Sequence, residues 1–189
     1  MKVCLSIDHE AKGENYLGLP VSVGKTRKRT FEYIMKKIWG RIQGWQEKLL
    51  SKAGKEILIK AVAQSIPTYV MSCFDLTKSL CDELSMMIAK YWWSQQDKNN
   101  KIHWLSWEKL TKPKKKGGLG FKDLHLFNMV MLCRQAWRLL TNPYTLCGQV
   151  LKAKYFPQSD ILSCRPYVGV PYTWRSILEG AELLKEGLI

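Results

Sequence analysis

The stretch GWQEKLLSKAGKEILIKAVAQSIPTY, residues 44–69, decides the fold because it predicts one basic amphipathic helix with a defined start and end. Ser51 is a suitable N-cap, since its hydroxyl can accept a hydrogen bond from a free N–H of the first turn. Pro67 is expected to end the helix, because proline has no N–H and disfavours helical geometry in the residue before it.

The predicted helix has an apolar and a polar side. At 100° per residue, the apolar stripe consists of Leu58, Ile59, Val62 and Ile66. The opposite side carries Glu56, Lys60 and Gln64. We expect the first side to pack against other helices and the second to face water.

Basic side chains gather where this helix begins. Lys48, Lys52 and Lys55 lie beside Trp45, a possible packing or stacking partner. Phosphate oxygens placed across a helix N-terminus could meet both the free N–H groups and these lysines. A solvated basic face without a ligand is the alternative.

Two further amphipathic segments flank the central helix. One runs from a cap at Thr30 to Trp45, with a bend or break expected at Gly40 and Gly44. Its apolar stripe consists of Phe31, Ile34, Ile38, Ile42 and Trp45. After an extended run at 68–76, the other begins at Thr77 and ends at the aromatic cluster 91–93. Three such helices with short connections predict a small bundle.

The rest of the chain adds a connector and a second helical region. Residues 94–127 form a basic, glycine-rich connector, and its segment 112–120 is not expected to hold regular structure. A helix is predicted from Asn128 to Thr141, and its inward-facing residues are Leu132, Cys133, Ala136, Trp137 and Leu140. A shorter helix should follow and end near residues 152–156, and a last helix should span about 172–185. The predicted fold class is mainly α: a helical bundle after a short extended N-terminal segment, followed by a C-terminal helical region.

The net charge of +14 is concentrated in two windows, 25–41 and 101–122, which together carry +12. A localised excess of this kind indicates a surface that binds a polyanion, and nucleic acid is the leading partner class. Besides the residues at the start of the central helix, the predicted phosphate contacts are Lys25, Arg27, Lys28, Arg29, Lys112, Lys114, Lys115 and Lys116.

Several other classes of function are not expected. The cysteines and histidines do not occur in closely spaced pairs, so no zinc site is predicted. Val23-Gly24-Lys25-Thr26 ends like a phosphate-binding P-loop, but Leu19 stands where that loop needs glycine. No signal peptide or membrane span is recognisable, and we expect an intracellular protein without a small-molecule substrate or cofactor.

Several motifs in fixed order resemble the reverse transcriptases of plant LINE-type (non-LTR) retrotransposons. They are YLGLP (16–20), GWQEKLLSKAGKEILIKAVAQSIPTYVMSCF (44–74), WW (92–93), KIHWLSW (101–107), KPKKKGGLGFKDL (112–124), LCRQAWRLL (132–140) and LKAKYFP (151–157). The resemblance covers nearly the whole chain from Tyr16 onward.

The resemblance implies a division of the chain. Residues 1–24 would be a remnant of the palm and primer-gripping strands, 25–93 a helical thumb, 94–127 the connector and 128–189 a truncated helical region. Lys52 and Lys55 would then lie against an RNA–DNA or DNA duplex, and the missing palm and fingers would be the protein partners. The chromosomal target of the family and the basic runs favour a nuclear location.

One departure from the family concerns catalysis. Reverse transcription needs carboxylates that hold two metal ions, normally including an Asp-Asp pair. The sequence contains no such pair, and its adjacent acidic residues Asp82 and Glu83 lie in the predicted third helix. We therefore expect no polymerase activity in this chain, and magnesium is implied only for a full-length parent. The alternatives are a decayed fragment without selected activity and a basic helical protein recruited by the host.

Overall fold

The structure is a computed structural model that describes residues 15–24, 26–46, 48, 50–94 and 102–187. This part is mainly α-helical, which confirms the predicted fold class, and it starts with a short antiparallel pair, β1 (Asn15–Tyr16) and β2 (Leu19–Pro20). The helices are α1 (Arg27–Gln46), α2 (Lys52–Leu58), α3 (Thr68–Met71), α4 (Lys78–Trp93), α5 (Trp107–Thr111), α6 (Leu124–Thr141), α7 (Leu146–Tyr155) and α8 (Tyr172–Gly187). A π-helical turn, Ile59–Ala63, continues α2, and short 3-10 helices occupy Lys114–Lys116 and Ile161–Ser163.

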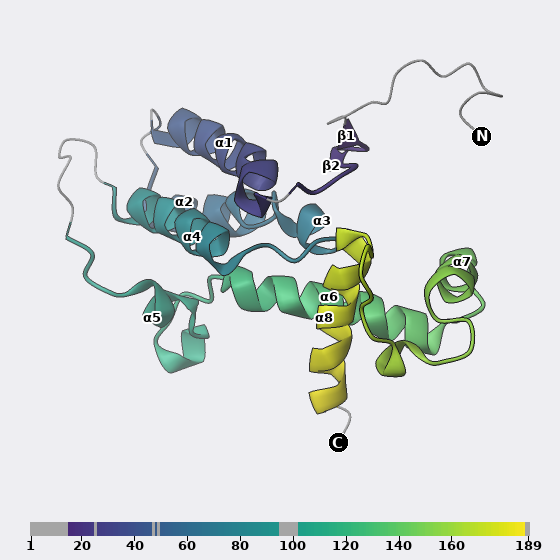
Figure 1. Cartoon of the computed structure of the whole chain (residues 1–189). Helices are drawn as coiled ribbons and strands as arrows, with labels where there is room; N and C mark the ends of the chain where they lie inside the picture. Colours follow the sequence, from purple (N-terminus) through teal and green to yellow (C-terminus); the bar gives the residue numbers. More distant parts are fainter. Residues whose placement is uncertain (1–14, 25, 47, 49, 95–101, 188–189) are drawn as a thin grey trace, which may run out of the picture.

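The helices α1, α2 and α4 lie together as the predicted bundle (Figure 1). The first hydrophobic core lies between α1, α4, α3 and the π-helical turn that continues α2. The apolar stripe of α1 is buried as expected, and its fully buried members are Phe31, Ile34, Ile38 and Ile42. From α4 the core receives Leu80, Leu84 and Ile88, which recur at helical spacing. Periodicity therefore predicted both helices and the buried stripe of α1. In α4 the predicted face was Leu80, Leu84, Met87 and Tyr91, but Met87 is only partly buried and Ile88 is fully buried.

Helix α1 differs from expectation at its start and in its middle. It begins at Arg27, so Thr30 lies inside the first turn and is not a cap. It also runs unbroken through Gly40 and Gly44, where a bend or break was predicted. Both glycines lie where an added Cβ would meet no atom within 4 Å, so the helix is held by its packed stripe on the other side.

The central stretch is capped as predicted but continues differently. The Ser51 hydroxyl accepts a hydrogen bond from the N–H of Gly54 at 3.2 Å, which confirms the N-cap. Pro67 does not lead into an extended run, because it adopts helical angles (φ −76°, ψ −14°) and precedes α3. At the start of a helix its missing N–H costs nothing, so the chain turns there and resumes a short helix.

The polar side of α2 and its π-helical turn does not face water as predicted, because the connector packs on it. Gln64 is fully buried, and its amide exchanges two hydrogen bonds of 3.2 Å with the backbone N–H and C=O of Lys122. Lys60 donates to the carbonyl oxygen of Leu119 at 2.6 Å and to Glu56 at 2.7 Å. Segment 112–120 also holds structure, since it includes a 3-10 turn that ends at Gly117 with φ +78°.

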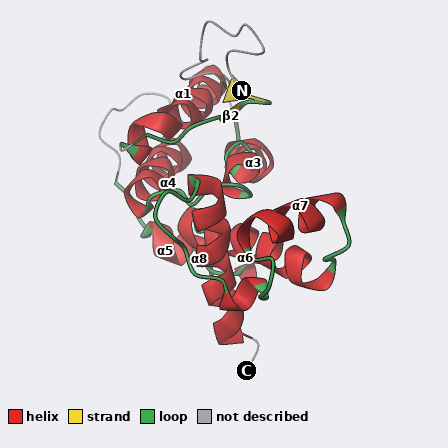
Figure 2. Cartoon of the chain, turned by 45° about the vertical axis from the view of Figure 1, so that its right-hand side comes forward, coloured by secondary structure: helices red, strands yellow, loops and turns green. Residues whose placement is uncertain are grey.

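A second core lies where α6 and α8 cross (Figures 1 and 2). Gly180 of α8 makes the close approach possible, since a Cβ there would lie 2.4 Å from the carbonyl carbon of Leu132. The indole of Trp174 fills this core between the rings of Tyr155 and Phe156, with centroid distances of 4.6 and 5.6 Å.

Helix α6 joins the two cores. It begins at Leu124, earlier than predicted, because the Asp123 carboxylate caps it by accepting hydrogen bonds from the N–H groups of His125 and Leu126. Leu132 and Ala136 are buried as predicted, but Trp137 is 45% exposed. The buried face instead includes Asn128, whose side chain bonds the loop that follows α3.

Candidate nucleic-acid interface

The structure places Lys52 and Lys55 against the C-terminal end of α4. Lys52 Nζ donates to the carbonyl oxygen of Trp92 at 2.7 Å and lies 4.9 Å from the centre of its ring. Lys55 Nζ contacts the carbonyl oxygen of Ser94 and its hydroxyl oxygen, the latter at 3.0 Å. Carbonyl groups at a helix C-terminus carry partial negative charge and lack helical partners, so cationic side chains stabilise them.

Other predicted contact residues also engage the protein. Trp45 packs on Tyr91 with ring centroids 5.6 Å apart, so it is a packing partner. The Arg27 guanidinium lies over the ring of Tyr172, and Lys28 pairs with a carboxylate of α4, Glu83.

The remaining predicted basic residues are exposed or lie outside the described residues. Lys114 pairs with Glu56 at 2.7 Å. Among described residues, no hydrogen bond or ion pair holds the side chains of Arg29, Lys48, Lys112, Lys115 and Lys116. Lys25 lies outside the described residues.

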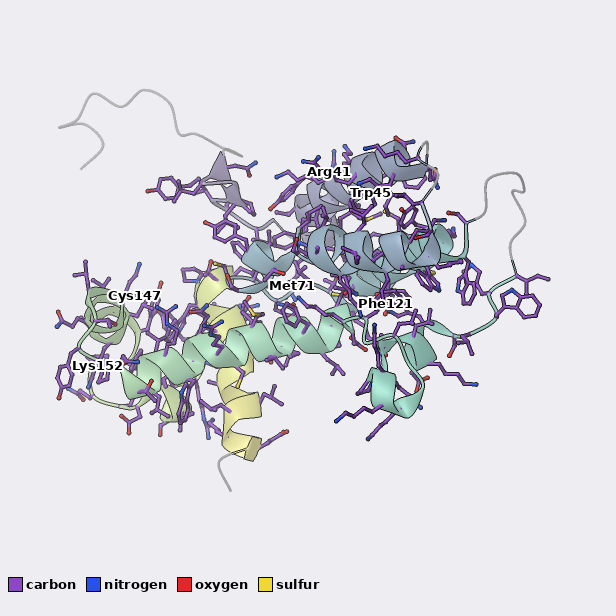
Figure 3. All side chains as sticks on the ribbon, turned by 180° about the vertical axis from the view of Figure 1, so that it is seen from behind. Arg41, Trp45, Met71, Phe121, Cys147 and Lys152 are labelled. Atoms are coloured by element: carbon purple, nitrogen blue, oxygen red, sulfur yellow. The ribbon has the colours of Figure 1, made fainter. Side chains whose placement is uncertain are left out.

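The outer face of α1 carries an extended exposed basic surface. Its exposed cationic side chains are Arg29, Lys36, Lys37 and Arg41, of which only Arg29 was predicted as a contact. Arg41 is labelled in Figure 3. Twelve residues of helix separate the first from the last, which is about 18 Å. In a helical projection Arg29 and Lys36 lie opposite the buried stripe, whereas Lys37 lies on its flank and Arg41 at its edge.

The two basic windows do not form one surface. Helix α1 lies on one side of α2 and α4, whereas α5 and the basic turn after it lie on the other (Figures 1 and 2). The turn is fixed there by the contacts of Glu56, Lys60 and Gln64 with the connector. A ligand gripping α1 would therefore not reach the lysines of residues 112–116 across a shared cleft.

Two findings concern metal binding and thiol chemistry in the described residues. They contain no group of three His, Cys, Asp or Glu side chains that could hold a metal ion. Burial, with the nearby charges of Asp75, Asp82 and Asp123, raises the pKa of Cys81 to about 12, so that thiol stays protonated. Within the same ranges, each helix is too short or too polar to cross a bilayer.

Comparison with known proteins places the chain among plant proteins. No family model and no solved structure matches it. The chain is 34% identical over 165 residues to the Arabidopsis thaliana protein named "Putative ribonuclease H protein At1g65750". The aligned residues make up 86% of this chain but only 26% of that protein. It is also 43% identical over 126 residues to the "Uncharacterized mitochondrial protein AtMg00310" of the same plant. These residues make up 66% of this chain and 82% of that relative. The chain therefore belongs to the same protein family as AtMg00310.

Proposed function

We propose that the chain is a thumb-like piece of a plant non-LTR retrotransposon reverse transcriptase, and that it binds nucleic acid through phosphate contacts independent of base sequence. The observation that carries this proposal is the outer face of α1, where Arg29, Lys36, Lys37 and Arg41 are exposed together with a single acidic residue in the helix, Glu32. Cations spread along one rigid element can neutralise several phosphates at once.

The glycines of α1 support the same surface. Gly40 and Gly44 lie among the exposed cations, and no atom stands within 4 Å of the place where their side chains would be. A helix without side chains at these positions lets a sugar–phosphate backbone approach the peptide groups closely. The cost in helix propensity, about 1 kcal/mol per glycine, is offset by the packed stripe on the buried side.

The relatives support a retroelement origin. The chain spans about a quarter of a relative whose name refers to a ribonuclease H, so we propose that the parent polypeptide joined a polymerase to further modules. The parent would be an RNA-directed DNA polymerase. Polymerisation is not proposed for this chain, because it lacks the adjacent aspartates that would hold the metal ions.

The test is a binding titration over a salt series. The full chain is mixed with an RNA–DNA hybrid, a DNA duplex and a single strand, each at several salt concentrations. For duplex DNA, log K falls linearly with log salt, and each lost phosphate contact makes this slope shallower by about 0.9. We expect Lys36→Ala with Lys37→Ala to reduce this slope by about 2 and to weaken binding to all duplex sequences equally.

A matched control removes the same charge elsewhere. Lys152 and Lys154 are exposed on α7, at the opposite end of the molecule from Arg41 on α1 (Figure 3). The double variant Lys152→Ala with Lys154→Ala should leave the slope unchanged. Equal losses in both double variants would show a diffuse charge effect, and absence of binding by the folded chain at low salt would reject the proposal.

A second candidate rests on the outer face of α6. Leu126 is 62% exposed, Val130 57% and Trp137 45%, and helical spacing brings these apolar side chains onto one stripe. The stripe favours a fragment that packs on other polypeptide in its parent and has no selected activity alone. Binding of a hydrophobic dye that Trp137→Gln reduces would support this candidate, and a chain that binds no dye would contradict it.

The nuclear location expected from the basic windows also stays a proposal. One relative is named as a mitochondrial protein, so the two compartments need a direct comparison. A fluorescent fusion in plant cells tests this, and mitochondrial fluorescence would overturn the nuclear assignment.

A further inference from the structure

The indole of Trp39 is an exposed aromatic surface on the basic helix α1, the outermost helix of the three-helix bundle (Figure 1). Its side chain is 46% exposed. The other large apolar side chains of this helix are buried or partly buried. The phosphate contacts proposed for α1 use its cations and do not account for this ring.

Most other tryptophans of the described chain pack against a second aromatic ring. These are Trp45, Trp92, Trp93, Trp107 and Trp174. Within the same described ranges, Trp39 makes no such ring contact, and neither a cation nor a hydrogen bond holds its indole. Nearly half of this side chain therefore lies in water, where a flat partner could cover it by stacking.

The residues one helical turn from Trp39 carry a cation and an amide. Lys36 precedes it by three positions and Gln43 follows it by four, so their Cβ atoms lie about 5–6 Å from that of Trp39. Both side chains are exposed, and no ion pair with a described residue engages Lys36. Glu32, the acidic residue of α1, lies two turns before Trp39, about 10 Å along the axis. The ring thus lies closer to a cation of its own helix than to the acid.

We propose that α1 binds a single strand of nucleic acid, with Trp39 as the stacking surface for one base and Lys36 as the contact for an adjacent phosphate. A base of a single strand can turn onto an aromatic side chain, whereas the bases of a duplex already cover one another. Stacking tolerates any base, and the amide of Gln43 can donate to and accept from a base edge. The inference rests on the proposed nucleic-acid function of α1 and names single strands as its preferred ligand.

An anionic lipid surface is the competing partner, because tryptophan and lysine also gather at bilayer interfaces. A helix that lies on a membrane inserts a whole apolar face. The apolar face of α1 is instead buried in the bundle, and its fully buried members are Phe31, Ile34, Ile38 and Ile42. The single exposed ring of α1 is sufficient to stack on a base but offers little apolar area to a bilayer. We therefore favour the nucleic-acid strand.

The test is an anisotropy titration of the full chain with two labelled single strands of about 12 nucleotides. One strand is intact, and in the other the bases are replaced by abasic sites. Trp39→Ala should weaken binding of the intact strand about five- to hundredfold, the range expected for the loss of one stacked base. The abasic strand keeps every phosphate, so its affinity should be the same for Trp39→Ala and the unmodified chain. Trp39→Phe keeps a ring and should recover most of the affinity for the intact strand.

Trp137 on α6 supplies the matched control, because its side chain is 45% exposed. Trp137→Ala should leave the affinity for the intact strand unchanged, and thermal melting checks that each variant is folded. Duplex binding and its salt dependence should be the same in Trp39→Ala and the unmodified chain, so the phosphate contacts are tested separately.

Three outcomes would overturn the inference. The first is equal affinity of Trp39→Ala and the unmodified chain for the intact strand, and the second is an equal loss for the intact and the abasic strand. The third is binding to phosphatidylserine vesicles that depends on Trp39 while strand binding does not. A folded chain that binds neither strand nor duplex at low salt would reject the proposed function as well.

Discussion

The ammonium group of Lys55 reaches both the carbonyl oxygen and the hydroxyl oxygen of Ser94, the residue that follows α4. The same hydroxyl donates to the carbonyl oxygen of Tyr91 at 2.7 Å, so one cation and one hydroxyl satisfy the end of the helix together. The start of α2 is thereby tied to the end of α4. A lysine that sequence alone assigns to phosphate recognition here stabilises the bundle.

Lys55→Met separates these two roles. The variant keeps most of the aliphatic stem but leaves the oxygens of Ser94 without their cation, so we expect the free energy of unfolding to fall by about 1–2 kcal/mol. Urea unfolding measures this change. If Lys55 instead contacts phosphate, the variant would make the slope of log K against log salt for duplex binding shallower by about 0.9 and would leave the free energy of unfolding unchanged.

Asn128 should be among the most sensitive positions in the chain. It is fully buried, accepts from the N–H of Leu76 at 2.7 Å, and donates to the carbonyl oxygens of Met71 and Phe74, both at 2.9 Å. Asn128→Ala leaves these groups unpaired inside the protein, which we expect to cost about 3–4 kcal/mol in urea unfolding. The exposed Asn142 is the control, and a comparable loss in Asn142→Ala would contradict this explanation.

Glycine substitutions should have opposite effects in two helices. In Gly180→Ala the new Cβ would lie 2.4 Å from the carbonyl carbon of Leu132 and 2.6 Å from the nitrogen of Cys133, and these backbone atoms cannot move aside. We expect a loss of about 1–3 kcal/mol from overpacking. Gly40→Ala and Gly44→Ala meet no atom within 4 Å and should each gain about 0.5–1 kcal/mol in helix propensity. Thermal melting gives both signs, and a stabilising Gly180→Ala would contradict the close crossing of α6 and α8.

Asp75 predicts a pH dependence of stability. Burial raises the pKa of this carboxyl above its ordinary value of 3.8, and Glu179 adds to the effect, while His125 and Arg27 oppose it. The folded state thus holds the proton more tightly than the unfolded chain, so this group's contribution to stability is present below pH 3.8 and is lost as pH rises through the raised pKa.

The corresponding experiment is urea unfolding of Asp75→Asn at low and at neutral pH. Removing the ionisation should raise the free energy of unfolding at pH 7 and change it little at pH 3, where both side chains are neutral. Asp160→Asn, at an exposed site, should show no such difference. A variant that is less stable only at pH 7 would mean that the attraction to Arg27 outweighs burial.

Sequence periodicity predicted the main helices because their packing is local and regular. The stripes of α1 and α4 recur at helical spacing, and the cap at Ser51 was readable from its residue type. The polar side of α2 was misassigned, because Gln64 looks like a solvated residue until Lys122, far along the chain, is placed beside it. Spacing within one helix carries no information about such a partner.

The candidate sites were only partly predictable for the same reason. The charge window 25–41 contains the exposed cations of α1. Lys52 and Lys55 at the start of α2 were predicted as phosphate contacts, yet they bind the end of α4. Their role depends on where a second helix ends in space. A cavity of about 390 Å³ beside α4 was not predictable, since its lining residues Asp82, Trp107 and His125 come from three segments without a shared motif.

The amide of Gln64 also bears on how the chain emerges from the ribosome. Its partner Lys122 is synthesised 58 residues later, and Asn128, which secures the loop after α3, comes later still. Until that point a nascent chain holding α1, α2 and α4 leaves the amide of Gln64 uncovered and the loop after α3 without the hydrogen bonds of Asn128. The three-helix bundle should therefore complete its folding only after the start of α6 has left the exit tunnel, and protease resistance of stalled nascent chains should appear at that length.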